Sequence, residues 1–246
     1  VYPEVTASFL PPPAACSPYT LTLVNQSLNA NGTFTWNFGD GSAESLSAQP
    51  SHLFETPADQ SSVYTIQLHA TSTYGCEDHI SHDVEVHATP LADVEVVQEE
   101  GCYPLNVTFA NLSTGGDQFE WSYGTGLNST ENAGEHTVAY FNPTSNVVTY
   151  PAVLTVSTDA GCSSQDVTYV EVLPEVEAQI EGGTSGCSPL EVDLLNLSNG
   201  AASYTWNFGD GDQSTAQHAN HIFITNPGED MTYTVSLVAQ SVHGCT

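Results

Sequence analysis

A tryptophan recurs at a constant interval along this chain, at Trp36, Trp121 and Trp206, with a step of 85 residues each time. Each copy lies in the same phrase, which reads TWNFGDG in the first and third repeats and EWSYGTG in the second. Self-similarity at a fixed period indicates an array of structural units, and this period suits small domains that each have their own core. We therefore predict three tandem domains. The predicted boundaries are 1–88, 89–173 with a degenerate motif, and 174–246.

The charge of the chain is one-sided. Its 246 residues include 29 Asp and Glu but no Lys or Arg, so the formal net charge is −29. Such a surface repels nucleic acids and anionic membranes, which excludes both as partners. No apolar run approaches the ~18 residues of a membrane span, so we expect no membrane insertion.

Each repeat contains two of the six cysteines. They are Cys16, Cys76, Cys102, Cys162, Cys187 and Cys245. The repeat symmetry favours one bond inside each domain, with the pairs Cys16–Cys76, Cys102–Cys162 and Cys187–Cys245. Metal thiolate ligation is disfavoured because the chain has no CxxC pair. Structural disulfides are typical of an oxidising compartment, so the predicted location is extracellular or at the cell surface.

The repeated phrase has the pattern of a half-buried strand. Phe34, Trp36 and Phe38 alternate with polar residues, which places the three rings on one face. The same positions of the other repeats hold Phe119, Trp121, Tyr123, Tyr204, Trp206 and Phe208. The GDG that follows in two repeats is typical of a turn, because Gly permits positive φ and Asp caps the backbone.

Further strands follow in each repeat. We align an aromatic segment across the three repeats, at residues 52–54 (HLF), 139–141 (AYF) and 221–223 (HIF). A tyrosine then stands twelve residues before each second cysteine, at Tyr64, Tyr150 and Tyr233, and opens a strand of alternating apolar residues. This pattern is similar to the tyrosine corner of immunoglobulin-like sandwiches.

A last strand is visible at Val84–Val86 and Val170–Val172, but the third repeat stops soon after its second cysteine. We therefore expect this chain to be a piece of a longer array. No segment has the apolar period of a helix. The predicted fold class is all-β, with three tandem immunoglobulin-like sandwiches in an elongated array.

An asparagine follows each first cysteine at the same distance, at Asn25, Asn111 and Asn196, always within Asn-x-Ser. One interpretation is N-glycosylation. The other is a turn in which Asn and Ser bond to the backbone, and the fixed place of this column in the repeat favours it.

These motifs together resemble the PKD (polycystic kidney disease) domain. The resemblance rests on WNFGDG, on the aromatic H-x-F segment, and on YTI or YTV before a Gly-Cys turn. It covers the whole chain and implies an immunoglobulin-like sandwich. The second repeat departs from the motif at Ser122, Tyr123 and Thr125. With their additional cysteine pair, the repeats are similar to the variant with an extra intradomain disulfide in surface adhesins of Bacteroidota, including gliding-motility-associated proteins.

Few residues have the pattern of a catalytic site, so we predict that the chain is not an enzyme. The chain has no G-x-S-x-G or H-E-x-x-H motif and no unpaired catalytic cysteine under the predicted pairing. Asp40, Asp210 and Asp212 offer hard oxygen ligands for calcium in surface turns. Capping of the turn by these carboxylates is the interpretation that the pattern favours, and no other cofactor is predicted.

The predicted function is a structural and adhesive stalk of a large secreted or surface protein, which spaces and displays binding elements. Its partners would be neighbouring domains of the same chain. One alternative is a filament subunit that completes its neighbour by strand addition. Another is an accessory region of a secreted hydrolase that binds surface glycans or proteins through exposed aromatics. The candidates for that role are Tyr2, Tyr19, Tyr74 and Tyr103.

Overall fold

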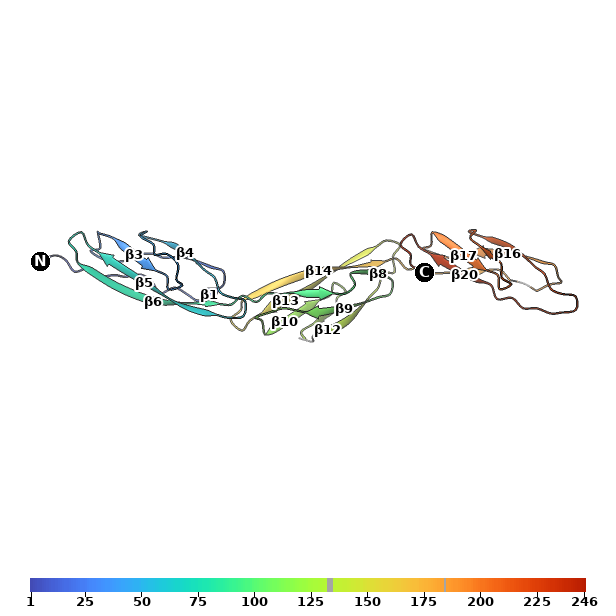
Figure 1. Cartoon of the computed structure of the whole chain (residues 1–246), viewed down its shortest axis with the longest axis horizontal. Coiled ribbons are helices and arrows are strands. Elements are labelled where there is room, and N and C mark those ends of the chain that lie inside the picture. Colours follow the sequence, from blue (N-terminus) through green and yellow to red (C-terminus); the bar gives the residue numbers. More distant parts are fainter. Residues whose placement is uncertain (132–134, 184) are drawn as a thin grey trace.

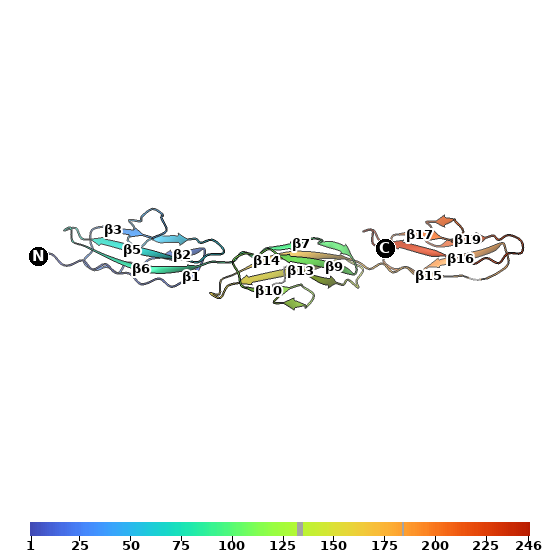
Figure 2. The same ribbon diagram turned by 60° about the horizontal axis from the view of Figure 1, so that its bottom comes forward.

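The protein is a row of three β-sandwiches joined end to end, as Figures 1 and 2 show. The structure is a computed structural model that describes residues 1–131, 135–183 and 185–246. All of its regular elements within these ranges are strands, which confirms the all-β prediction. The described residues contain no helix with the length and apolar character of a membrane span.

The strands divide by sandwich. The first contains β1 (Ala15–Cys16), β2 (Tyr19–Thr22), β3 (Phe34–Asn37), β4 (Ser51–Phe54), β5 (Ser62–Thr71) and β6 (Glu77–His87). The second contains β7 (Val94–Val96), β8 (Glu100–Cys102), β9 (Leu105–Asn111), β10 (Gln118–Ser122), β11 (Asn128–Ser129), β12 (Glu135–Tyr140), β13 (Val148–Ser157) and β14 (Ser163–Leu173). The third contains β15 (Ile180–Glu181), β16 (Leu190–Asn196), β17 (Ser203–Asn207), β18 (Gln213–Ser214), β19 (Ala219–Phe223) and β20 (Ser236–Gln240).

Two sheets face each other in each sandwich. In the first, β1-β6-β5-β3 faces β2-β4, and in the second, β11-β10-β13-β14-β8 faces β12-β9-β7. In the third, β18-β17-β20 faces β15-β16-β19. The short strands β1 and β8 run parallel to β6 and β14, and all the other paired strands are antiparallel.

The repeated tryptophan forms the centre of each core. Trp36, Trp121 and Trp206 are all 0% exposed, which confirms that the aromatic face of the motif strand points inward. The indole Nε1 of Trp36 donates to the Ser47 carbonyl at 3.0 Å, and that of Trp206 donates to the Ala216 carbonyl at 2.9 Å. Large buried rings of this kind contribute much of the apolar area in a small core.

The tyrosine corner is also confirmed. Tyr64, Tyr150 and Tyr233 each donate their hydroxyl to a backbone carbonyl nine residues upstream, at 3.0, 2.6 and 3.2 Å. Each bond fastens the start of a central strand to the end of the aromatic segment before it.

The asparagine column has the structural role that its place in the repeat favours. The Oδ1 atoms of Asn25, Asn111 and Asn196 accept from the backbone N–H two residues on, at 2.9, 3.0 and 2.8 Å. The serine at that next position then accepts from the segment that opens its sandwich. Its donors are the backbone N–H groups of Ser8, Asp93 and Gln179. The motif therefore holds the opening segment of each sandwich against the strand that the asparagine ends or follows.

One sequence alignment was wrong by one residue. In β12 the counterparts of His52 and Phe54 are Val138 and Tyr140, because both pairs meet equivalent positions of the facing strand. Val138 and Tyr140 are buried, whereas Phe141, which we aligned with Phe54, is 55% exposed. The loop before β12 differs in length between repeats, so counting along the chain could not set this register.

The last strand closes the first two sandwiches but not the third. β6 and β14 each pair along the whole length of β5 or β13 and bury two valines each in the core. In the third sandwich β20 pairs only with β17, so its outer edge is free in the part of the chain that the structure describes. A groove of about 1010 Å³ opens between β16 and the segment that precedes β20, over Leu190, Val192, Tyr233 and Val235.

Candidate functional site at the junctions between sandwiches

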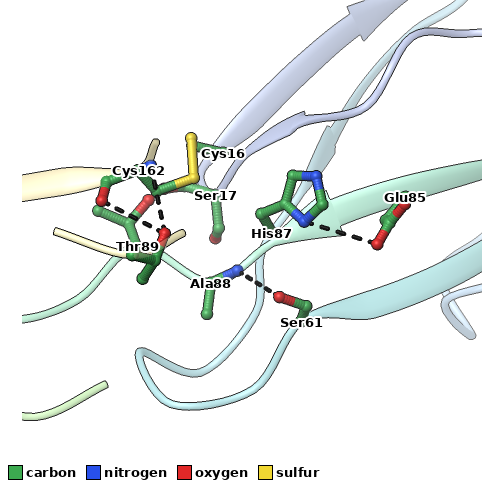
Figure 3. The surroundings of a disulfide bond; sticks show 9 residues. Cys16, Ser17, Ser61, Glu85, His87, Ala88, Thr89 and Cys162 are labelled. Atoms are coloured by element: carbon green, nitrogen blue, oxygen red, sulfur yellow. Dashed lines mark hydrogen bonds and ion pairs between the residues drawn. A yellow bond between two sulfur atoms is a disulfide. The ribbon is translucent and has the colours of Figure 1, made fainter. Parts of the chain in front are cut away.

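Two covalent connections join the first and second sandwiches. One is the chain itself, and the other is a disulfide between Cys16 of β1 and Cys162, whose Cα atoms lie 5.6 Å apart (Figure 3). Cys162 ends the turn between β13 and β14, where Gly161 adopts φ +81°. A bond between these two residues links the end of one sandwich to the hairpin tip of the next.

Hydrogen bonds order the chain around this disulfide. The Ser17 N–H donates to the His87 carbonyl at 2.9 Å, and the Ser17 hydroxyl accepts from the Thr56 N–H at 2.9 Å. The Thr89 hydroxyl donates to the Ser17 carbonyl, and the Ala88 N–H donates to Ser61 Oγ at 3.0 Å (Figure 3). The linker is therefore fastened to the first sandwich before it enters the second.

Close backbone contact adds to the junction. A Cβ atom built at Gly115 of the second sandwich would lie 1.7 Å from the carbonyl oxygen of Ala58 in the first. Gly115 also has φ +79°, a conformation that favours glycine. The two sandwiches meet here at a distance that leaves no room for a side chain.

The second junction repeats the first. Cys102 of β8 bonds to Cys245, which follows β20, with the same Cα separation of 5.6 Å. The sequence separations of the two bonds are also similar, at 146 and 143 residues. Each bond connects the first cysteine of one sandwich to the second cysteine of the next.

The predicted pairing inside each domain, Cys16–Cys76, Cys102–Cys162 and Cys187–Cys245, was therefore wrong. Cys16 lies in register with His87 at the end of β6, whereas Cys76 directly precedes the first residue of that strand. The 11 residues of β6 separate these positions by about 35 Å at ~3.3 Å per residue, far beyond the ~7 Å between Cα atoms that a disulfide allows. In the second sandwich, β14 separates Cys102 from Cys162 in the same way.

Two cysteines are free. Cys76 is half-buried at the outer end of the first sandwich, and Cys187 is exposed beside the groove of the third. Their bonded counterparts Cys162 and Cys245 are only 1% and 4% exposed.

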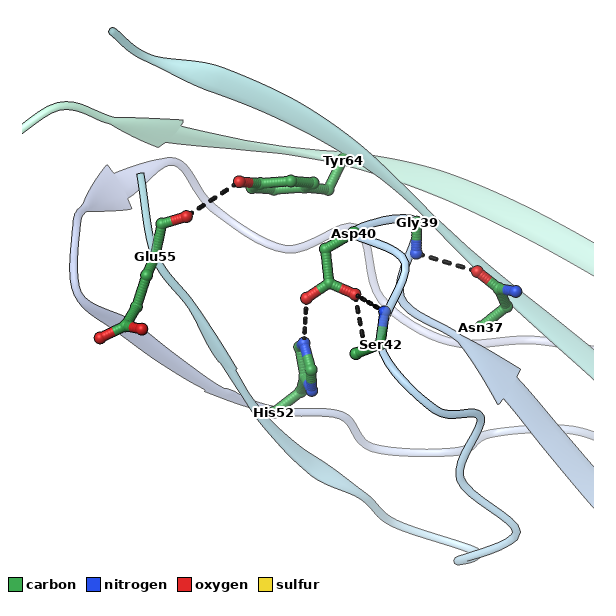
Figure 4. Close-up of polar contacts among 7 residues, drawn as sticks. All are labelled: Asn37, Gly39, Asp40, Ser42, His52, Glu55 and Tyr64. Atoms are coloured by element: carbon green, nitrogen blue, oxygen red, sulfur yellow. Dashed lines mark hydrogen bonds and ion pairs between the residues drawn. The ribbon is translucent and has the colours of Figure 1, made fainter. Parts of the chain in front are cut away.

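The turn aspartates form a second feature, which involves residues that the sequence analysis did not assign. Asp40 Oδ2 lies 2.6 Å from His52 Nε2, and its Oδ1 accepts from the Ser42 N–H at 3.0 Å (Figure 4). The His52 ring stacks on Phe38, with centroids 3.9 Å apart. Partial burial acts to raise the pKa of Asp40, but hydrogen bonds from Ser42 and His52 outweigh it, so this pKa lies below its usual value.

The third sandwich has the same pair. His221 Nε2 lies 2.6 Å from Asp210 Oδ2, and the His221 ring stacks on Phe208 at 4.0 Å. The hydrogen bond from His221 is the main cause that lowers the pKa of Asp210. One sequence signal could have revealed the pair. The second repeat loses both members together, with Thr125 in place of the aspartate and Val138 in place of the histidine.

The calcium prediction stays a prediction. Asp210, Asp212 and His221 present ligand atoms that all lie within 4.8 Å of one another, whereas Asp40 has His52 and Ser42 as its partners. Both oxygens of Asp40 and of Asp210 already have protein partners, namely a backbone N–H of the turn and the Nε2 atom of His52 or His221. This geometry agrees with capping of the turn, the interpretation that the sequence favoured.

We expect the Asp40→Asn variant to lower the melting temperature of the first sandwich by about 2–5 °C at pH 7. Because the pKa of Asp40 is depressed in the folded protein, its stabilising effect is complete above the unfolded pKa of about 3.9. It is lost as the pH falls through the folded value. Thermal melts followed by circular dichroism should show that the gap between variant and wild type closes below pH 4.

The matched control is Glu44→Gln, which removes an exposed carboxylate near the same turn. A gap for Asp40→Asn that stays constant down to pH 2 would show that the carboxylate charge contributes nothing. The same melts with and without a calcium chelator test the calcium prediction.

The four exposed-aromatic candidates do not form one strip. Tyr2 and Tyr74 stack at the outer end of the first sandwich, with centroids 4.1 Å apart. Tyr19 and Tyr103 instead pack against the cores of the first and second sandwiches. The described surface therefore presents one aromatic pair from this set.

The comparisons with known proteins agree with the fold. A family model described as PKD domain matches residues 6–88 and 174–246. Among solved structures, the PKD1 domain of Vibrio cholerae metalloprotease PrtV is 28% identical over 35% of this chain and 98% of its own, with a TM-score of 0.28. The PKD1 domain of Vibrio anguillarum Epp is 22% identical over 36% of this chain and 99% of its own, with a TM-score of 0.28.

A three-domain fragment of titin, I67–I69, is 10% identical over 96% of this chain and 98% of its own, with a TM-score of 0.43. No curated protein sequence matches the chain.

Proposed function

The chain belongs to the PKD domain family, and from that premise we propose that it is a stiff spacer, a stalk segment that holds binding elements away from a surface. PKD and immunoglobulin-like domains are commonly structural or binding modules outside the cell and are generally non-catalytic.

The observation that carries the proposal is the double connection at each junction. A single linker between two domains acts as a hinge, and relative motion of the domains is then expected. Here a disulfide forms a second connection at each of the two junctions, at a different point from the linker. Bending in the plane of both connections would have to stretch one of them, so the row of sandwiches resists it.

The path of the second connection also matters under tension. From Cys162 the chain enters β14, which runs the length of the second sandwich and ends at Leu173, next to the following linker. A strand is already close to the full extension of a polypeptide. A pulling force can therefore pass along the bond and β14 without first unfolding the sandwich.

Two other properties of the chain agree with an extracellular location for such a stalk. PKD domains and disulfides are typical of extracellular proteins, where the bonds persist. A surface without Lys or Arg offers no cleavage site to trypsin-like proteases. The narrower assignment to surface adhesins of Bacteroidota is part of this proposal, but the intradomain disulfide that we associated with it is withdrawn.

Small-angle X-ray scattering of the oxidised and the reduced chain tests the stiffness. We expect a rod with a maximum dimension on the order of 100 Å, because each last strand of 11 residues spans about 35 Å. Reduction should shorten the mean end-to-end distance and broaden its distribution, since each junction becomes a hinge. Identical profiles in both states would show that the disulfides do not stiffen the rod.

A second candidate function, assembly by strand complementation, predicts that the groove of the third sandwich accepts a strand. The apolar residues that line this groove and the free edge of β20 correspond to the surfaces that β6 and β14 cover in the other two sandwiches. A peptide with the sequence of residues 163–173 should raise the melting temperature of the third sandwich. A matched peptide with Asp in place of both Val170 and Val172 should not, and equal effects of the two peptides would reject this function.

A further inference from the structure

The two disulfides follow one pattern, and this pattern leaves two free cysteines at its two ends. Each bond joins the first cysteine of one sandwich to the second cysteine of the next. Cys76 is the second cysteine of the first sandwich, and Cys187 is the first cysteine of the third. They therefore lie at opposite ends of the row. Under the same pattern, each is the type of cysteine to which the other would bond.

The turn around Cys76 already has the conformation of its bonded counterparts. The Cys76 carbonyl accepts from the Ser72 N–H at 2.8 Å, as the Cys162 and Cys245 carbonyls accept in their turns at 2.9 and 2.8 Å. The Cys76 N–H donates to Ser72 Oγ at 3.1 Å, and the equivalent donor distances are 3.3 and 3.1 Å. The preceding glycines have φ values of +85°, +81° and +88°.

The main difference at Cys76 is the lack of cover. Its counterparts are almost completely buried against the sandwich before them, whereas Cys76 is half-buried. Beside it, Tyr2 and Tyr74 form their stack while 60% and 59% exposed. Stacked aromatic rings at the end of an acidic rod form an apolar surface of the kind that protein interfaces use.

The residue after Cys187 makes the same hydrogen bond as the residue after the bonded Cys16. Ser188 accepts from the Thr225 N–H at 3.0 Å, as Ser17 accepts from Thr56 beside the bonded Cys16. Cys187 is exposed and borders the open groove of the third sandwich.

We propose that Cys76 and Cys187 each form a further disulfide of the same kind, Cys76 with the first cysteine of a sandwich that precedes it and Cys187 with the second cysteine of a sandwich that follows it. A second copy of this chain presents both of these partner cysteines. The contact is heterologous, because one end of the rod meets the opposite end of the next. Between copies of this chain, such a contact repeats without closing and gives a linear polymer. This inference goes beyond the proposed spacer role, since it depends on the disulfide pattern and not on the stiffness of the junctions.

The bond forms by thiol–disulfide exchange. One thiolate attacks a low-molecular-weight disulfide, and the second thiol then displaces the small thiol from the mixed disulfide. With oxidised glutathione as the oxidant, two cysteine thiols become one disulfide and one oxidised glutathione becomes two reduced molecules. The net charge of −29 opposes association, so moderate salt should favour the reaction by screening.

Two single variants test the pairing. Cys76→Ser keeps only Cys187 free, Cys187→Ser keeps only Cys76 free, and both retain the two internal bonds. After incubation with a glutathione redox buffer in moderate salt, we expect each variant alone to stay monomeric on non-reducing electrophoresis. An equimolar mixture should give about tenfold or more dimer, as expected where complementary contacts select one pairing.

Mass spectrometry should identify a Cys76–Cys187 peptide in that dimer and in the ladder of polymers that the wild type forms. Equal dimer yields in the mixture and in each variant alone would overturn the proposal, because the thiols would then pair by random collision. Monomers that carry only glutathione would overturn it as well. Neither result changes the X-ray scattering expected from a single rod. The spacer proposal can therefore fail or hold independently of this one.

Discussion

Reducing both disulfides is expected to add about 500 Å to the maximum length of this chain when it is pulled between Val1 and Glu181. The Cys16–Cys162 bond closes a loop of 146 residues, and each residue contributes ~3.3–3.6 Å when fully extended. With the bond intact, the covalent path runs from Val1 to Cys16, across to Cys162, and on through β14 to Glu181. That path can reach only about 120 Å, however completely the sandwiches unfold.

Single-molecule force spectroscopy on the full chain, with handles at Val1 and Glu181, measures this difference directly. The oxidised chain should show little extension before the handles fail, whereas the reduced chain should show the release of folded sandwiches. The matched control replaces Cys102 and Cys245 by Ser, which leaves the first bond and the short path intact. A release of about 500 Å from the oxidised wild type would show that the bond does not carry the load.

Trp36→Ala is expected to lower the free energy of unfolding of the first sandwich by about 3–5 kcal/mol. The indole is 0% exposed and meets Phe9 edge-on, with ring centroids 5.1 Å apart. Its removal leaves a cavity and also leaves the Ser47 carbonyl without the indole donor. A loss of this size is comparable to the whole stability of many small domains.

Hydrogen exchange measured by mass spectrometry tests this prediction, because it reports each sandwich separately. Exchange should accelerate in β3, β5 and β6 and remain slow in the strands of the second sandwich. Leu46→Ala, at a side chain that is 75% exposed, is the control and should change stability by less than about 0.5 kcal/mol. Equal acceleration in all three sandwiches would show that the cores are not independent.

The core could be predicted because its pattern is local. A strand places alternate side chains on one face, so Phe34, Trp36 and Phe38 identified an inward face without knowledge of any partner strand. The tyrosine corner and the asparagine turn are local as well, since each hydrogen bond spans at most nine residues. Features of this kind can be recognised from a single repeat.

The Asp–His pair was missed for the opposite reason. Asp40 and His52 meet only because the turn after β3 folds over β4, and their separation in sequence differs from that of Asp210 and His221. The register of β12 failed in the same way, because an aromatic pair at 140–141 could be aligned in two ways. Both errors concern which residues face each other across a loop of variable length.

The sequence by itself determined that the unit repeats three times, that each copy is a β-sandwich, and that its aromatic residues form the core. It could not determine the disulfide pairing, because a bond within each repeat and a bond from each repeat to the next preserve the same period. The tertiary structure decided between them. A last strand of 11 residues holds the two cysteines of one sandwich about 35 Å apart, and end-to-end stacking brings each to its partner in the neighbouring sandwich.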